Sequence, residues 1–172
     1  LFSRTGTSVS HCPCSNMRLG SGILPLNKML DKGVNIGLGV DGSASNDSGN
    51  LLNEARQALY LQRVNETNNF YLNARNALWL ATAGGATALN RDDIGSIKVG
   101  NCADFAIYDS TSLELAGSVE DPIGGLIFCG PLKTRWTICN GQIISENNNI
   151  KNINIEDTIN QHNSLSRKLI NS

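Results

Sequence analysis

The chain has 172 residues and a net charge of −1, with 40% hydrophobic and 5% aromatic residues. The near-neutral charge argues against a protein that binds nucleic acid, which needs a basic patch. No apolar run is long enough to span a membrane, so we expect no membrane partner. Five cysteines spread through apparent strands indicate reduced thiols and a cytoplasmic location.

Residues 8–46 predict the unit around which the chain is organised: a strand, a loop, a helix and a second strand. The first strand ends at His11, and Cys12-Pro13-Cys14-Ser15-Asn16 predicts a loop after it. Pro25 suits the first turn of a helix, where its missing N–H needs no partner, and Gly33 suits the position just after the helix. The apolar face of that helix is marked by Ile23, Leu26, Met29 and Leu30. Two strands joined in this way are expected to lie parallel, with a right-handed crossover.

The second strand, residues 34–40, has bulky side chains on one face and glycines on the other. Because side chains alternate across a strand, we expect Asp41 to share the face of Gly37 and Gly39. A face cleared of side chains that ends in a carboxylate is typical of the inside of an active-site barrel, whose catalytic groups lie at the carboxyl ends of strands. The alternative is structural: Asp41 would shape a turn with Gly42, or cap the next helix, since Asp-Gly is a common turn pair.

Two motifs carry a family resemblance: HCPCSNMRLGSGI from His11 and GLGVDGSASND from Gly37. They resemble the metal-dependent amidohydrolase superfamily, in its branch of purine, pterin and triazine aminohydrolases, with the 8-oxoguanine deaminases as the nearest group. The resemblance implies an α/β fold, namely the C-terminal part of a (β/α)8 TIM barrel followed by strands of a small β-sandwich domain. It places Asp41 at the end of the eighth strand as a ligand of the catalytic metal, and His11 at the pocket mouth after the seventh. Ser45, in the loop after Asp41, is also expected to touch substrate; for His11 and Ser45 a purely structural hydrogen-bonding role is the alternative.

The resemblance also implies a reaction. One divalent metal ion, zinc with iron as the alternative, would lower the pKa of a water toward neutrality, and Asp41 would both bind the metal and accept the proton. The expected substrate is a small purine-like molecule, 8-oxoguanine, which hydrolytic deamination converts to urate and ammonia. Alternatives are a triazine hydrolase, or a guanine, other purine or pterin deaminase of the same branch. A structural β-domain module that serves assembly is the non-enzymatic alternative, and the full-length protein is expected to be a homo-oligomer.

The length and the residues present predict a C-terminal fragment that is inactive alone. A (β/α)8 barrel needs about 250 residues. The chain holds only two histidines, His11 and His162, so the family's upstream His-x-His pair, its other histidine ligands and its catalytic Glu have no counterpart. Cys12-Pro13-Cys14 is a weak metal signal without a second ligand pair. Pro13 is expected to shape the loop, and a pocket contact from Cys12 or Cys14 stays open.

Three segments are expected: residues 1–92 in the barrel, 93–150 in the small β-domain and 151–172 as a C-terminal amphipathic helix. In the first, residues 50–64 predict a helix with Asn50 as N-cap and Arg56 on a solvated face. A polar linker at 65–69, a helix at 71–83 and a close-packing run of small residues at 81–86 follow.

In the second segment, strands are expected near residues 105–107, 125–129, 134–139 and 142–145, and a polar loop at 147–149. Asn140-Gly141 predicts a hairpin turn between the last two strands, and Asp104 is expected to make a structural hydrogen bond. In the terminal helix, residues 156–170, His162 is expected to be a packing or interface residue.

Overall fold

The structure, a computed structural model, describes residues 1–65 and 72–171, and the chain divides into two compact units. Unit 1 comprises residues 1–101 and 110–132, and unit 2 comprises residues 102–109 and the chain from 133 onward. The borders expected at residues 92 and 150 do not coincide with these units. Residues 93–101 pack within unit 1, where a Cβ on Gly95 would lie 2.7 Å from the Cβ of Ala86.

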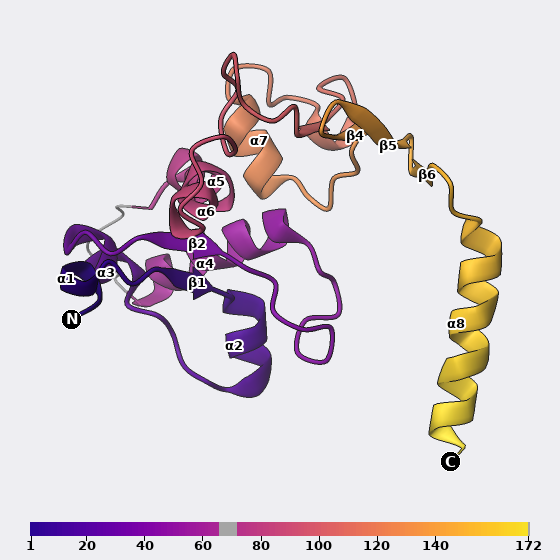
Figure 1. The fold of residues 1–172 in the computed structure, drawn as a ribbon, viewed down its shortest axis with the longest axis horizontal. Helices are drawn as coiled ribbons and strands as arrows, with labels where there is room; N and C mark the ends of the chain where they lie inside the picture. Colours follow the sequence, from indigo (N-terminus) through magenta and orange to yellow (C-terminus); the bar gives the residue numbers. More distant parts are fainter. Residues whose placement is uncertain (66–71, 172) are drawn as a thin grey trace. The chain divides into compact units, whose positions relative to one another are not determined.

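Unit 1 is built on two short parallel strands with helices around them (Figure 1). The strands are β1 (Val9–His11) and β2 (Ile36–Leu38), and Val9 pairs with Ile36 while His11 pairs with Leu38. The helices are α1 (Phe2–Thr5), α2 (Pro13–Leu19), α3 (Leu26–Asp31), α4 (Leu51–Asn65), α5 (Ala74–Ala81), α6 (Ala83–Ala88), the 3-10 helix η1 (Leu113–Leu115) and α7 (Pro122–Phe128). The predicted strand–helix–strand unit with parallel strands is confirmed.

The core of unit 1 joins one strand to four helices. Its fully buried members include Leu26, Ile36, Leu59, Leu80 and Ile127, one each from α3, β2, α4, α5 and α7. Burying an aliphatic side chain of this size stabilises a fold by about 1.5–3 kcal/mol. These contacts hold β2, the strand that leads to Asp41, against the helices.

Glycines let α6 approach β2 at backbone distance. A Cβ on Gly37 would lie 2.8 Å from the Cα of Gly85, and a Cβ on Gly84 would lie 2.8 Å from the carbonyl oxygen of Ile36. Small residues at 81–86 therefore do serve close packing, as expected. The expectation that the glycine face of β2 is cleared for a pocket is wrong at Gly37, because α6 occupies that space.

Two helices in the first twenty residues were not predicted. Residues 13–19 form α2 instead of a loop, because Pro13 stands in the first helical turn and Gly20 ends the helix in the left-handed conformation at φ 65°. Pro13 therefore starts a helix where a loop was expected. Residues 2–5 form α1, which ends at Gly6 in the same conformation at φ 67°.

The helix predicted at 50–64 is confirmed as α4, with Asn50 Oδ1 accepting from the backbone N–H of Asn53 at 3.1 Å. Arg56 does not extend into solvent: its Nε donates to the carbonyl oxygen of Ile127 at 2.6 Å, which ties α4 to the end of α7. The predicted linker (65–69) and the predicted helix start at Tyr71 fall largely outside the described residues, and α5 begins at Ala74 with Asn73 as its N-cap.

Unit 2 contains an antiparallel sheet in the order β3 (Phe105–Ile107), β4 (Trp136–Cys139), β5 (Gln142–Glu146) and β6 (Asn149–Ile150). Asn140 and Gly141 form the predicted hairpin turn, both with positive φ. The structural role expected for Asp104 is confirmed, since its Oδ1 accepts from the backbone N–H of Asn140 at 2.7 Å. The unit ends in helix α8 (Ile155–Ile170).

One strand prediction and one loop prediction in this part of the chain need correction. The run at 125–129 lies in α7, which Asp121 caps by accepting from the backbone N–H of Gly124 at 3.0 Å while Pro122 occupies the first turn. The polar loop expected at 147–149 is a turn at Asn147 and Asn148 that leads into β6. No helix within the described residues has the length and apolar character needed to cross a bilayer.

Candidate active site

Asp41 follows the end of β2 by three residues and adopts a left-handed backbone conformation at φ 62°. This conformation is uncommon for a residue with a side chain, and Asp is among the residues that tolerate it. The alternation used to place Asp41 on the glycine face does not reach it, because the strand ends at Leu38. The position of Asp41 is set by the loop instead.

Two serine hydroxyls converge on the Asp41 carboxylate. Ser15 Oγ donates to Oδ2 at 2.6 Å, Ser45 Oγ donates to the same atom at 3.2 Å, and the two hydroxyls lie 2.8 Å apart. The Ser15 bond, with contributions from the Gly42 backbone and Ser45, holds the pKa of the Asp41 carboxyl below its ordinary value. Asp41 is therefore ionised at neutral pH. The structure brings together two of the predicted residues, Asp41 and Ser45, and adds Ser15, which is 1% exposed.

A buried glutamate, Glu54, holds the loop around Asp41 in place through hydrogen bonds. Glu54 of α4 is 0% exposed, and its Oε2 accepts from the backbone N–H of Cys14 at 2.9 Å. Its Oε1 accepts from Asn46 Nδ2 at 2.7 Å, and Asn46 Nδ2 also donates to the carbonyl oxygen of Val40 at 2.8 Å. Glu54 thus joins the start of α2 to the residue before Asp41. Glu54 was not identified from the sequence as part of the site, because its burial depends on packing between elements that are distant in the sequence.

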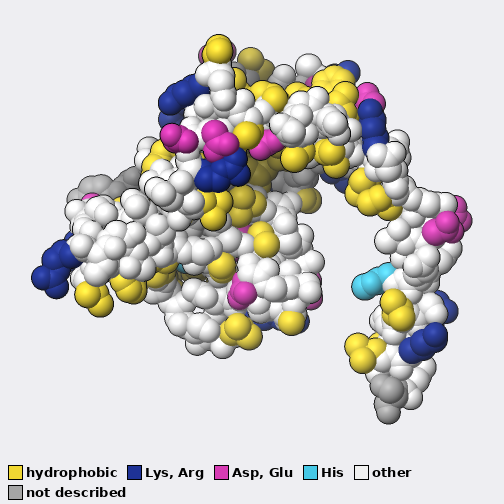
Figure 2. Space-filling model, in the orientation of Figure 1, with side chains coloured by type: hydrophobic (Ala, Val, Ile, Leu, Met, Phe, Trp, Pro, Cys, Tyr) yellow, Lys and Arg dark blue, Asp and Glu magenta, His cyan; other side chains and the backbone are white. Residues whose placement is uncertain are grey.

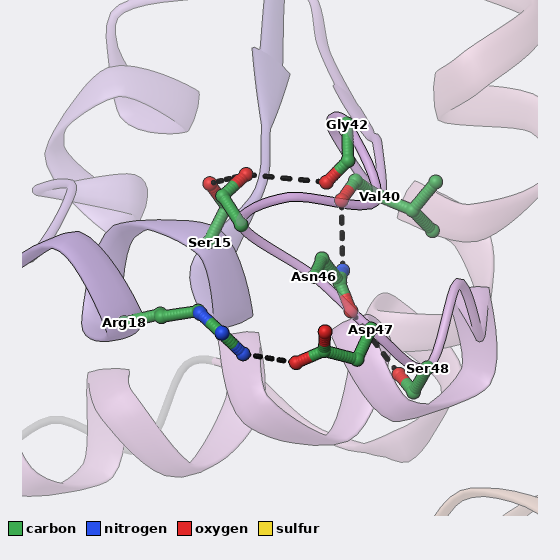
Figure 3. A network of polar contacts seen from close by, with 8 residues as sticks. Ser15, Arg18, Val40, Gly42, Asn46, Asp47 and Ser48 are labelled. Carbon is green, nitrogen blue, oxygen red and sulfur yellow. Dashed lines mark hydrogen bonds and ion pairs between the residues drawn. The ribbon is translucent and has the colours of Figure 1, made fainter. Parts of the chain in front are cut away.

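The loop after Asp41 is also held by polar contacts on its exposed side. Arg18 of α2 forms an ion pair with Asp47, and Ser48 Oγ donates to Asn46 Oδ1 at 3.1 Å. Figure 3 shows Ser15 and Arg18 on α2 directed toward the loop that carries Gly42, Asn46 and Asp47. The pair between Arg18 and Asp47 is exposed and contributes little to stability, so the buried Glu54 bonds dominate.

His11 ends β1 as predicted, but it is 2% exposed rather than open at a pocket mouth. Burial lowers its pKa from 6.5 to about 4, so the imidazole is neutral. Neither ring nitrogen has a hydrogen-bond partner within the described part of the chain. A Cβ on Gly39 would lie 2.4 Å from Ser10 Oγ and 3.1 Å from Cys12 Sγ, so Ser10 and Cys12 share a face that His11 does not. No hydrogen bond joins His11 to Asp41 or Ser45 among these residues.

The cysteines beside His11 have distinct surroundings. Asn53 Nδ2 donates to Cys14 Sγ at 3.3 Å. Burial, reinforced by the Glu54 carboxylate, raises the pKa of Cys14 to about 12. A thiol with that pKa stays protonated at neutral pH and is a poor nucleophile and metal ligand. All five cysteines lie in described residues, and none forms a disulfide.

Asp41 fits the chemistry of a metal ligand, since an ionised carboxylate is a common ligand of divalent metals. Across residues 1–65 and 72–171, no three His, Cys, Asp or Glu side chains come together in a way that could hold a metal ion. Within that part of the chain, Asp41 can therefore supply one ligand but does not belong to a complete set.

The sequence profile of the amidohydrolase family matches residues 1–156 of this chain. The chain belongs to the amidohydrolase family. Among curated proteins, the 8-oxoguanine deaminase of Pseudomonas aeruginosa is 48% identical over 124 residues, which cover 72% of this chain and 27% of that protein. The 5′-deoxyadenosine deaminase of Methanobrevibacter smithii is 33% identical over 159 residues, covering 91% of this chain and 37% of that protein.

Solved structures confirm the fold class of this family member. The zinc complex of the atrazine chlorohydrolase of Arthrobacter aurescens superposes with a TM-score of 0.88 at 34% identity, covering 95% of this chain and 37% of that one. An adenosine deaminase of Xanthomonas campestris with bound zinc gives a TM-score of 0.90 at 28% identity, covering 99% and 39%. The expected fold class, the C-terminal part of an α/β barrel followed by strands of a small β-domain, is therefore confirmed. The chain spans 27% and 37% of the length of the two curated relatives.

Proposed function

We propose that the protein in which this chain occurs is a metal-dependent hydrolase that deaminates a nitrogen heterocycle, with Asp41 as a metal ligand. The observation that carries the proposal is the ionised Asp41 carboxylate, which Ser15 and Ser45 fix just beyond β2 in an amidohydrolase fold. A turn-forming Asp41 would need neither serine.

A bound divalent metal, proposed to be zinc, would lower the pKa of a water and so make hydroxide available at neutral pH. Zinc bound in the two solved neighbours supports this choice, and iron is the alternative. The Asp41 carboxylate would hold the ion, and it would accept the proton that the attacking water loses. The two serine bonds favour the ionised form of Asp41, so they suit its ligand role and make it a weaker base.

His11 and Ser45 are proposed to contact the substrate; His11 is 2% exposed in this chain, and its contact would use the ring nitrogens that no described residue hydrogen-bonds. A neutral imidazole can donate a hydrogen bond from one nitrogen and accept one at the other, which suits the alternating donors and acceptors of a purine edge. The low pKa of His11 supports this neutral form. Ser45 lies beside Asp41, so a contact from its hydroxyl would lie near the reacting carbon.

The proposed substrate is 8-oxoguanine, which loses its amino group as ammonia and takes up water to become urate. Support comes from the 48% identity to the Pseudomonas aeruginosa 8-oxoguanine deaminase. Deoxyadenosine-type nucleosides and triazines are the competing substrates. The former are favoured by a match over 91% of the chain and the latter by the atrazine chlorohydrolase likeness. Ammonia release from 8-oxoguanine, guanine and 5′-deoxyadenosine, with chloride release from atrazine, separates them; a higher kcat/KM on any rival would overturn the 8-oxoguanine assignment.

The decisive variant is Asp41→Asn, which keeps the size of the side chain but removes its charge and its capacity to accept the proton. In the full-length protein, kcat/KM should fall by about 10²–10⁴, the usual effect of losing a positioned base, and the zinc content should fall with it. Asp47→Asn, in the same loop and paired with Arg18 on the surface, is the matched control and should leave both values near wild type. Near-normal activity with full zinc in Asp41→Asn would show that Asp41 only forms a turn.

A further inference from the structure

Helix α8 presents an apolar stripe that the described residues of unit 2 leave exposed. All 16 of its residues are exposed, and the helix is capped by Asn154, whose Oδ1 accepts from the backbone N–H of Asp157 at 3.2 Å. The apolar members of the stripe are 38% to 78% exposed, and with the central histidine the α8 stripe consists of Ile155, Ile159, His162, Leu165 and Leu169. Figure 2 shows histidine and hydrophobic side chains along one side of this helix. The family profile ends at residue 156, within the first turn of α8.

The sequence of α8 is symmetric in residue type about His162. Counting equal steps away from His162 in both directions, apolar residues oppose apolar ones: Ile159 with Leu165 and Ile155 with Leu169. Acidic residues oppose basic ones in the same way, Glu156 with Lys168 and Asp157 with Arg167. Thr158, Asn160 and Gln161 oppose Ser166, Ser164 and Asn163.

A two-fold contact between identical chains requires this arrangement, because residue i of one copy meets residue j of the other and j meets i. We propose that α8 pairs antiparallel with α8 of a second copy of this chain, with the two-fold axis at His162. The stripes then face each other along their length, and the two His162 side chains meet at the centre. The occupant is a second copy because an identical helix run in reverse matches both the apolar and the charged positions of α8.

Charge favours the antiparallel direction. Glu156 and Asp157 lie in the first turn of α8, and Arg167 and Lys168 lie in the last. Antiparallel pairing places each acidic turn beside the basic turn of the other copy and opposes the two helix dipoles favourably. Parallel pairing would place acid beside acid and base beside base, which is destabilising.

The polar residue at the centre of the α8 stripe and the short length of α8 determine how tightly the dimer is expected to form. A polar residue within an apolar seam lowers stability but fixes the register of a helix pair, and His162 has that position. A 16-residue helix is about 24 Å long, and a pair of such helices buries less than the roughly 1,000 Å² of a stable interface. We therefore expect a dimer that forms with rising concentration, in the micromolar range.

Sedimentation of the full-length protein across about 1–200 µM tests the pairing. The wild type should shift to twice its mass, and Ile159→Glu with Leu165→Glu should abolish the shift. Asn160→Glu with Ser164→Glu, at symmetric positions on the opposite face of α8, is the matched control and should dimerise as the wild type does. A monomeric wild type, or a dimer that survives the Ile159 and Leu165 changes, would overturn the proposal.

Charge exchange tests the direction and the partner. Reversing only the acidic turn, with Glu156→Lys and Asp157→Lys, should weaken dimerisation about tenfold, because four weak pairs of opposite charge become like charges. Reversing only the basic turn, with Arg167→Glu and Lys168→Glu, should do the same. Combining all four changes should restore the wild-type dissociation constant. Failure of the combined variant to recover would exclude an antiparallel pair of identical helices.

Crosslinking keeps the proposal testable if the glutamate variants misfold. His162→Cys places two thiols together at the two-fold axis, so mild oxidation should give a peptide crosslinked between residue 162 of one copy and residue 162 of the other. Asn160→Cys, on the far face, should give none. Mass spectrometry of the peptides separates this product from disulfides of the exposed Cys129 and Cys139. An absent 162–162 crosslink, or an equal yield from Asn160→Cys, would mean that the α8 stripe packs elsewhere.

Discussion

Replacing Glu54 should loosen the loop that holds Asp41. Glu54→Ala removes two hydrogen bonds to a carboxylate, at 2.9 Å from the Cys14 backbone N–H and at 2.7 Å from Asn46 Nδ2. Hydrogen bonds to charged groups contribute about 1.5–3 kcal/mol each, which gives about 3–6 kcal/mol for the pair. Relief from burying a charge at a site that is 0% exposed offsets part of this loss. We expect a net decrease of about 3 kcal/mol in the free energy of unfolding.

Urea denaturation of the full-length protein measures this decrease as a lower midpoint, by roughly 1–2 M for a typical dependence on urea. Glu54→Gln keeps one acceptor oxygen but turns an amide donor toward one of the two N–H groups, so its effect should be intermediate. Glu120→Ala removes an exposed glutamate and is the matched control, with an expected change within about 0.5 kcal/mol. A Glu54→Ala midpoint equal to that of Glu120→Ala would refute the idea that Glu54 supports the site.

Two further predictions concern the titration of groups beside the site. Burial lowers the His11 pKa from 6.5 to about 4. Between these two pH values the unfolded chain binds a proton at His11 and the folded chain does not. The free energy of unfolding should therefore fall as the pH drops from 6.5 to 4, by about 3 kcal/mol at most. His11→Asn should flatten that part of the stability curve, and an unchanged slope would contradict the buried neutral imidazole. Because the pKa of Cys14 is raised to about 12, iodoacetamide at pH 8 should label exposed Cys129 and Cys139 long before Cys14. Peptide mass spectrometry gives the order, and labelling of Cys14 at a similar rate would refute it.

Local signals predicted well where the backbone chemistry is specific. Asn140-Gly141 formed its hairpin because both residues accept positive φ, and Asp104 bonded the same turn. The parallel pairing of β1 and β2 followed from a helix between two apolar runs. The polar tip at Asp41 with Ser45 nearby was also predicted, although the metal role of Asp41 stays a prediction.

Prediction failed where a local pattern fits two structures or where distant segments decide the outcome. Short apolar runs fit a strand or a buried helix equally, so the run at 125–129 needed the Asp121-Pro122 start signal to identify it as helical. Glu54 and Ser15 contribute through partners 26 to 40 residues away in the sequence, and no local pattern names such partners. The glycine face of the second strand was expected to leave space for a pocket, whereas at Gly37 the backbone of α6 fills that space.

The close approach of Gly37 to Gly85 limits which substitutions the site can accept during evolution. The strand that leads to Asp41 rests on α6 through main-chain atoms, with a distance of 2.8 Å from a Cβ on Gly37 to the Cα of Gly85. Surrounding side chains such as Leu59 and Leu80 can be exchanged for others of similar volume, at a cost in stability but without moving this support. Gly37 cannot gain a side chain unless the helix itself withdraws, whereas a Cβ on Gly85 would meet only the carbonyl oxygen of Leu80, at 3.9 Å. Substitutions in the neighbouring core should therefore leave the backbone that precedes Asp41 in place. To reposition the Asp41 carboxylate, a designer would have to change α6 and β2 together.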